Sequence, residues 1–274
     1  MSKVAAIVLD IDGTLVSARH GVSDEDLGTL RACRERGIIL YLATARPRHL
    51  VFRPGEAGPE ADFLRDRGTF CSGARVVEEA LSHRTCKQLS GEMVRRAVET
   101  VRDRREGLQV AIQRQDGSHA FRHPVSDDML PGWGVNRDQL TDFELASQKP
   151  CLRLVFFRTV GGEDIRGLGD VLRERGFPEA RLRISDSGLW MEMVAKDATK
   201  EGGILELLGL RDIAPERVVV FGNDGSDIGM FETFGVRVAM GNACPELKRL
   251  ADQVTLSCEE SGVSRGIQEL LGSS

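Results

Sequence analysis

Residues 8–16 read VLDIDGTLV, and two carboxylates, Asp10 and Asp12, stand where a continuous apolar run ends. Such a run, here residues 4–10, predicts a strand that is covered on both faces, as in a parallel sheet. Carboxylates this close repel each other, so one is protonated, a cation lies between them, or both face water. The stretch therefore predicts an α/β fold with a charged site at the end of its first strand.

The alternation of strands and helices continues at both ends of the chain. Ser23 and Asp26 resemble a capping box that starts a helix over 23–37, Gly37 is its stop, and a second apolar run follows at 38–44. This βαβ unit is typical of a parallel sheet. Near the other end, the pattern predicts a helix at 199–210, a strand at 217–224, a helix at 226–235 and a strand at 236–242.

The middle of the chain has a different pattern. It predicts a helix at 89–105, a hairpin around Asp116-Gly117, a strand at 151–160, a helix at 163–176 and two alternating strands at 180–185 and 189–194. Alternation of apolar and polar residues is typical of antiparallel strands with one wet face. We therefore expect a Rossmann-like parallel-sheet core domain, residues 1–78 and 192–274, interrupted by an inserted α+β domain, residues 79–191.

Composition limits the partners that the chain can have. The 274 residues carry a formal net charge of −5, without the basic bias that nucleic-acid binding usually needs. No apolar run reaches about 18 residues, so no membrane span is expected. The N-terminal stretch lacks the apolar segment of a signal peptide, and the six cysteines form no CxxC pair, so we expect a cytoplasmic protein with reduced thiols. The oligomeric state stays open.

Polar residues follow several of the predicted strands at the edge where α/β proteins bind ligands. These segments are Asp10–Thr14, Thr44–Arg46, the loop that holds Lys200, and Asn223–Asp227. Carboxylates are the hard oxygen ligands that Mg²⁺ prefers. A threonine hydroxyl and a lysine ammonium group are donors suited to phosphate oxygens. Together they indicate phosphoryl transfer assisted by a metal ion.

The motifs resemble those of the haloacid dehalogenase-like (HAD) phosphatase superfamily. DIDGTL at 10–15 resembles its first motif, LATAR at 42–46 its second, Lys200 its third and VVVFGNDGSDIGMF at 218–231 its fourth. VAMGNACPELKRLADQVT at 238–255 is similar to the end of Cof-type members. An insertion of mixed strands between the second and third motifs implies a type IIB cap domain. The resemblance covers the whole core and is weak within the cap.

The resemblance implies a role for each matching residue. Asp10 would be the nucleophile that forms an aspartyl-phosphate, and Asp12 the general acid and then base. Thr44 and Lys200 would hold phosphate oxygens. Further contacts to the substrate phosphate are expected from Gly13, Ala45, Arg46 and Ser226. The expected cofactor is Mg²⁺, with ligands Asp10, Asp12 (through its backbone carbonyl), Asn223 and Asp227.

The fourth motif departs from the family pattern. Asn223 stands where the first acid is usual, and Ser226 stands where an asparagine is usual. An amide oxygen can still bind Mg²⁺ but brings no charge, so we expect weaker metal affinity rather than loss of activity. Whether Asn223, Asp224 or Asp227 binds the metal directly stays open.

These observations favour a Mg²⁺-dependent phosphatase that acts on small phosphorylated metabolites such as sugar phosphates. A phosphomutase on the same core and a non-enzymatic binding module are the alternatives. The residues of the insertion that select a substrate are not readable from any motif, although Arg122, Trp133 and Trp190 are candidates. His119 and His123 are expected at the surface rather than as a metal pair.

Overall fold

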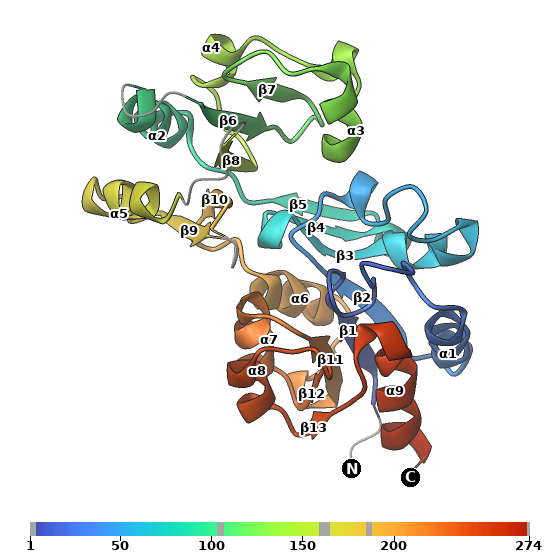
Figure 1. Ribbon diagram of the computed structural model, residues 1–274. Coiled ribbons are helices and arrows are strands. Elements are labelled where there is room, and N and C mark those ends of the chain that lie inside the picture. The colour runs from blue at the N-terminus through green and yellow to red at the C-terminus, as the bar shows by residue number, and fades with distance from the viewer. Residues whose placement is uncertain (1–3, 103–106, 159–164, 185–187, 273–274) are drawn as a thin grey trace. The chain divides into compact units, whose positions relative to one another are not determined.

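The computed structural model describes residues 4–102, 107–158, 165–184 and 188–272 (Figure 1). The chain forms two compact units, Met1–Thr85 with Thr199–Ser274, and Cys86–Ala198. We call them the core unit and the inserted unit. The sequence predicts domain boundaries after residues 78 and 191. In the structure the chain leaves the core unit after residue 85 and returns to it after residue 198, seven residues later in each case. The strand at 83–86 pairs within the core sheet, and the strand at 190–195 pairs within the sheet of the inserted unit.

The core unit is built on an eight-stranded sheet in the order β13-β12-β11-β1-β2-β3-β4-β5. The strands are β1 (Ala6–Leu9), β2 (Ile39–Ala43), β3 (Arg67–Phe70), β4 (Arg75–Glu78), β5 (His83–Cys86), β11 (Val218–Gly222), β12 (Val236–Ala239) and β13 (Gln253–Val254). Strands β13 to β3 pair in parallel, with β1 between β11 and β2. All four residues of β1 are buried, as expected for a strand covered on both faces.

Helices lie on both sides of this sheet in Figure 1, α1 and α9 on one side and α6, α7 and α8 on the other. Their bounds are α1 Asp24–Glu35, α6 Lys200–Gly209, α7 Ile228–Thr233, α8 Pro245–Leu250 and α9 Gly262–Gly272. The Ser23 side chain accepts a hydrogen bond from the Asp26 N–H at the start of α1, which confirms the predicted cap. Gly37, at φ +80°, follows the end of that helix.

The antiparallel extension of the core sheet is not visible in the sequence pattern. Strand β3 pairs in parallel with β2 but antiparallel with β4, and β5 continues the sheet beyond β4. β3 reads RGTF and β5 reads HRTC, so neither has the apolar run that marks a buried strand. The sequence therefore predicted the parallel centre of the sheet and missed this edge.

The inserted unit contains a five-stranded sheet, β7-β6-β8-β10-β9, in which every neighbouring pair is antiparallel. Its strands are β6 (Leu108–Gln113), β7 (His119–Phe121), β8 (Arg153–Arg158), β9 (Ala180–Ile184) and β10 (Trp190–Ala195), and its helices are α2 (Gly91–Arg102), α3 (Leu130–Trp133), α4 (Phe143–Ala146) and α5 (Arg166–Glu174). The predicted hairpin and antiparallel strands are present. The parts of the predicted elements at 103–105, 159–160, 163–164 and 185 lie outside the described residues.

One face of β10 is not the wet face that its alternation suggested. Glu192 is fully buried, and its carboxylate lies 3.3 Å from Arg153 and 3.9 Å from Arg183. A buried carboxylate needs such partners, because an unpaired charge inside a protein is costly.

In the described part of the chain, no helix has the length and apolarity that crossing a membrane requires.

Candidate active site

The parallel register of the core sheet brings three strand ends together. Leu9, the last residue of β1, pairs with Leu42 of β2 and with Phe221 of β11. Asp10 follows Leu9 directly, and its N–H donates to the Phe221 carbonyl at 3.2 Å. Thr44 follows β2 and Asn223 follows β11. Side chains distant in the sequence therefore surround the carboxyl end of β1.

Lys200 links the first motif to the fourth. Thr199 caps α6 through the N–H of Gly202, which places Lys200 at the first position of the helix. The Lys200 Nζ lies 2.7 Å from Asp10 Oδ1, 2.7 Å from Asp227 Oδ1 and 3.0 Å from Ser226 Oγ. The structure therefore brings together four residues that the sequence had placed in one site, Asp10, Lys200, Ser226 and Asp227.

Charge is not balanced within this cluster. Two carboxylates, Asp10 and Asp227, share one ammonium group, and all three side chains are at most 8% exposed. Burial, reinforced by the charge of Asp227 and opposed by Lys200, raises the pKa of Asp10 to about 7. A further cation beside Asp10 would offset the excess negative charge of the two carboxylates, because buried like charges need compensation.

The carboxamide of Asn223 lies beside Asp10 on the side away from Lys200. One terminal atom of this amide is 2.9 Å from the Asp12 carbonyl oxygen, 3.2 Å from Asp10 Oδ2 and 3.0 Å from Thr14 Oγ1. If this atom is the nitrogen, its two hydrogens are donated among these oxygens. If it is the oxygen, three oxygens converge without a donor between Asp10, Asp12 and Asn223. The orientation of the amide therefore decides between two situations. Either the oxygens of Asp10 and Asp12 already accept hydrogen bonds from Asn223, or they form with the Asn223 oxygen a group that can bind a cation.

With the amide oxygen of Asn223 facing Asp10 and Asp12, the three oxygens would fit Mg²⁺. Octahedral ligands about 2.1 Å from a magnesium ion stand about 3 Å apart, which matches the separations of 2.9 and 3.2 Å found here. Among the described residues, no three side chains of His, Cys, Asp or Glu form a metal-binding group. The candidate donors are therefore one carboxylate, one backbone carbonyl and one amide oxygen, from Asp10, Asp12 and Asn223.

Asp227 contacts protein groups through both of its oxygens. Oδ1 contacts Lys200, and Oδ2 accepts from the backbone N–H groups of Asn223 at 2.9 Å and Asp224 at 3.2 Å. The residue is fully buried. Asp224 accepts from the Ser226 N–H at 2.7 Å and caps a short 3₁₀ helix, η8 (Gly225–Asp227). These contacts tie Asp227 to the loop backbone and to Lys200, and its role as a metal ligand stays a prediction.

Arg46 holds the second carboxylate of the first motif. Its Nε and Nη2 donate to Asp12 Oδ2 at 2.9 Å and Oδ1 at 2.5 Å, and its Nη1 donates to the Val51 carbonyl at 3.0 Å. The same guanidinium forms an ion pair with Glu56. Arg46 is 5% exposed, whereas the Asp12 side chain is 57% exposed. Arg46 therefore orients Asp12, which stays accessible, and the contact of Arg46 with a substrate phosphate stays a prediction.

The remaining expected phosphate contacts are partly occupied. Thr44 is buried, and its Oγ1 accepts from the Arg46 N–H at 3.0 Å. The Gly13 N–H donates to the Val16 carbonyl at 3.0 Å, so it is not directed at a ligand. Gly13 has φ +78°, and a Cβ there would lie 2.5 Å from the other terminal atom of the Asn223 carboxamide. Ala45 follows Thr44 and is half-buried.

Sequence reasoning missed two residues that support this site. Glu56 lies in a loop without periodicity, so nothing predicted its contact with Arg46. Asn242 donates from Nδ2 to the Gly13 carbonyl at 2.8 Å and accepts from the Cys258 N–H at 3.0 Å. Asn242 belongs to the stretch 238–255, which is similar to the end of Cof-type members, but this similarity implies no role for Asn242.

The candidate selectivity residues belong to the inserted unit. Trp133 packs on Phe121 and Phe157 with ring centroids 5.2 and 5.3 Å away, and Arg122 donates to the carbonyls of Val101 and Arg102. His119 is 1% exposed and lies against Phe121, so the expectation of a surface histidine was wrong. The sequence pattern predicts the strand that holds His119 but does not show the aromatic residues that bury it.

Comparisons with known proteins identify the family and the fold. Residues 7–267 match the family model of the haloacid dehalogenase-like hydrolases. The chain is 39% identical to the stress response protein YhaX of Bacillus subtilis (strain 168). The alignment covers 96% of this chain and 92% of YhaX. This chain is 22% identical, over 98% of both chains, to the 5-amino-6-(5-phospho-D-ribitylamino)uracil phosphatase YitU of the same organism. Among solved structures, the subclass IIB sugar phosphatase BT4131 superposes with a TM-score of 0.79 at 24% identity, over 97% of this chain and 98% of that one.

Proposed function

The chain belongs to the haloacid dehalogenase-like hydrolase family, and from that premise we propose that it is a magnesium-dependent phosphatase of small phosphorylated metabolites. The observation that carries the proposal is the position of Asp10. Its buried carboxylate lies 2.7 Å from Lys200 on one side and 3.2 Å from the Asn223 amide on the other. A carboxylate held in this way is fixed for attack on phosphorus, and its ester splits one difficult step into two easier ones.

In the proposed reaction, Asp10 attacks the phosphorus atom and the bond to the leaving oxygen breaks. Asp12, oriented by Arg46 and open to solvent, gives its proton to that oxygen. Asp12 then takes a proton from the water that attacks the aspartyl-phosphate, which releases inorganic phosphate and restores Asp10. Lys200 and Thr44 stabilise the charge on the phosphoryl oxygens.

Asp10, the Asp12 carbonyl and Asn223 would hold the metal ion. When bound, Mg²⁺ supplies positive charge that offsets the charge on Asp10 and on the phosphoryl group. Asp227 would keep Lys200 in place.

The proposed substrates are sugar phosphates or similar metabolites in the cytoplasm, without a nucleic-acid partner. The name of YitU refers to a phosphorylated ribityl compound, and that of BT4131 to sugar phosphates. Both carry the phosphate on a small polyol or sugar. We assign the choice of leaving group to the inserted unit.

The test is a screen of p-nitrophenyl phosphate and phosphorylated metabolites with the purified protein and Mg²⁺, with Asp10→Asn as the blank. Phosphate release by the wild type, absent in the blank, supports the proposal. Isomer formation that needs a bisphosphate activator would identify a phosphomutase instead. Failure to turn over any compound, with the protein folded and loaded with Mg²⁺, would identify a binding module.

A further inference from the structure

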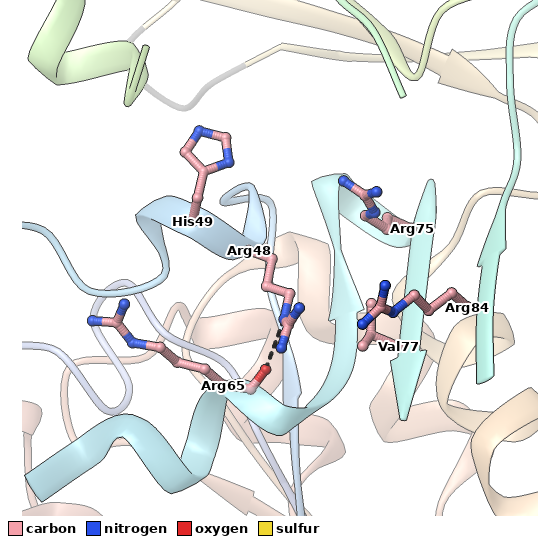
Figure 2. Close-up of a pocket in the computed structure, with 6 residues that line it drawn as sticks. All are labelled: Arg48, His49, Arg65, Arg75, Val77 and Arg84. Carbon is pink, nitrogen blue, oxygen red and sulfur yellow. Dashed lines mark hydrogen bonds between the residues drawn. The ribbon is translucent and has the colours of Figure 1, made fainter. Parts of the chain in front are cut away.

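A strongly basic pocket, separate from the candidate active site, lies within the core unit. A pocket of about 320 Å³ is lined by Arg48, His49, Arg65, Arg75, Val77 and Arg84 (Figure 2). Apart from Val77, every lining residue is basic. Its volume is at the lower end of the range for small-molecule sites. The proposed reaction uses none of these six residues.

Several separate elements build this pocket. Arg48 and His49 lie in the 3₁₀ helix η1 (Arg48–Leu50), and Arg65 lies in the 3₁₀ helix η2 (Pro59–Asp66). Arg75 and Val77 share one face of β4, since alternate residues of a strand point the same way. Val76, between them, lies on the other face, where a Cβ at Gly203 of α6 would be 3.2 Å from it. The pocket is therefore on the side of β4 away from α6.

Figure 2 shows the guanidinium groups of Arg48 and Arg84 directed toward one another over Val77. Both contact one carboxylate, with Glu79 lying 2.6 Å from Arg48 and 2.7 Å from Arg84. Arg84 and Arg48 hold the pKa of Glu79 below its ordinary value, so this carboxylate stays ionised at neutral pH. One negative charge between two guanidinium groups leaves the pair positive, and the guanidinium of Arg75 lines the same pocket.

Donor capacity points to an anion with several oxygens. Each guanidinium has five N–H donors. Arg48 Nε donates to the Arg65 carbonyl at 3.0 Å, so this bond and the contacts with Glu79 use only part of the donors of Arg48 and Arg84. Arginine forks match phosphate geometry, and a phosphate carries a charge of about −1.5 to −2 at neutral pH. Val77, at 1% exposure, gives the site an apolar floor that strengthens such contacts.

The pocket adjoins the active site along the chain. Arg48 is two residues after Arg46, and two peptide units span at most about 7 Å. The loop that leads into β4 is bonded to the same segment, because the N–H groups of Cys71 and Ser72 donate to the carbonyls of Arg46 and Thr44 at 3.1 and 3.0 Å. We propose that this pocket is a second phosphate-binding site, filled either by a second phosphate of the substrate or by free inorganic phosphate.

The first experiment measures binding and needs no turnover, so it does not rest on the proposed phosphatase activity. Inorganic phosphate is titrated calorimetrically into the protein without divalent cations. In Arg84→Gln, and more strongly in Arg75→Gln/Arg84→Gln, one class of sites should weaken by about tenfold, since charge-assisted hydrogen bonds are lost. Arg265→Gln, which removes an exposed arginine of α9 paired with Glu269, is the control that matches the charge change of Arg84→Gln. Identical isotherms in wild type and double variant would overturn the proposal.

A second experiment identifies the source of the phosphate and depends on turnover. Glucose 6-phosphate and glucose 1,6-bisphosphate are compared as substrates. If the occupant is a second substrate phosphate, the double variant raises KM for the bisphosphate by about tenfold and leaves the monophosphate KM unchanged. If the occupant is free phosphate, both KM values stay and the isotherm still weakens. Arg84 is 63% exposed, so Arg84→Gln alone keeps the test valid if the double variant does not fold.

Discussion

The substitution Asn223→Asp tests the proposed magnesium site. It places a second carboxylate where the amide now lies 3.2 Å from Asp10 Oδ2. At an effective dielectric constant of about 20, two unit charges at that separation repel by about 5 kcal/mol. The wild-type amide has no such repulsion and donates hydrogen bonds instead when its nitrogen faces the oxygens.

Magnesium should therefore bind the variant more tightly. Relief of even a third of this repulsion corresponds to a factor of more than ten in affinity, and we expect the Mg²⁺ Kd to fall about tenfold to a hundredfold. Without metal the variant should be less stable, with a Tm about 2–4 °C lower for each kcal/mol of repulsion that proton uptake does not remove.

The measurements are calorimetric Mg²⁺ titration and thermal unfolding in EDTA and in saturating Mg²⁺. Gln268→Glu on α9, which adds the same charge at an exposed position, is the control and should change neither value. A Kd for Mg²⁺ that stays the same or rises in Asn223→Asp would show that Asn223 does not face the ion.

Three further predictions concern the surroundings of the pair in the first motif. Arg46→Lys should lower kcat about tenfold to a hundredfold with a smaller change in KM, because an ammonium group cannot fix both oxygens of Asp12; Arg265→Lys, measured alongside, should leave kcat unchanged. Burial raises the pKa of Glu56, but Arg46 and Arg53 lower it further, to a net value below the ordinary one. Glu56→Gln should thus cost about 1.5–3 kcal/mol in urea unfolding at neutral pH, and the loss should shrink as the pH falls through the depressed pKa of Glu56, where the carboxylate takes up a proton; a loss independent of pH would contradict this. Gly13→Ala should destabilise more than Gly37→Ala, since both have φ near +80° but only the first meets the Asn223 side chain, and equal losses of unfolding free energy would count against that contact.

The strand ends of the core could be predicted because their signal is local. Apolar runs followed by Asp10, Thr44 and Asn223 mark buried parallel strands, and parallel strands align their carboxyl ends. The loop that holds Lys200 was grouped with these strand ends, but a lysine at a helix start is usually solvated, so the family resemblance was needed to support its role. The structure adds that this lysine is buried between two carboxylates.

The contacts that the sequence could not predict are long-range pairings of polar side chains. Glu56 reaches Arg46 from a loop without pattern, and Glu192 is buried because Arg153 and Arg183 lie on the neighbouring strands β8 and β9. Alternation alone assigns such a glutamate to a wet face. Only the register of the neighbouring strands reveals its partners.

The chain passes between the two units only twice, after Thr85 and after Ala198. Both junctions on the core side are tied to α6, since Thr85 donates to Glu206 at 2.5 Å and Thr199 caps the helix that presents Lys200. A different insertion could be spliced between these two threonines while the lysine kept its anchorage. In this way the inserted unit could be replaced during evolution while the proposed active site of the core unit stayed unchanged.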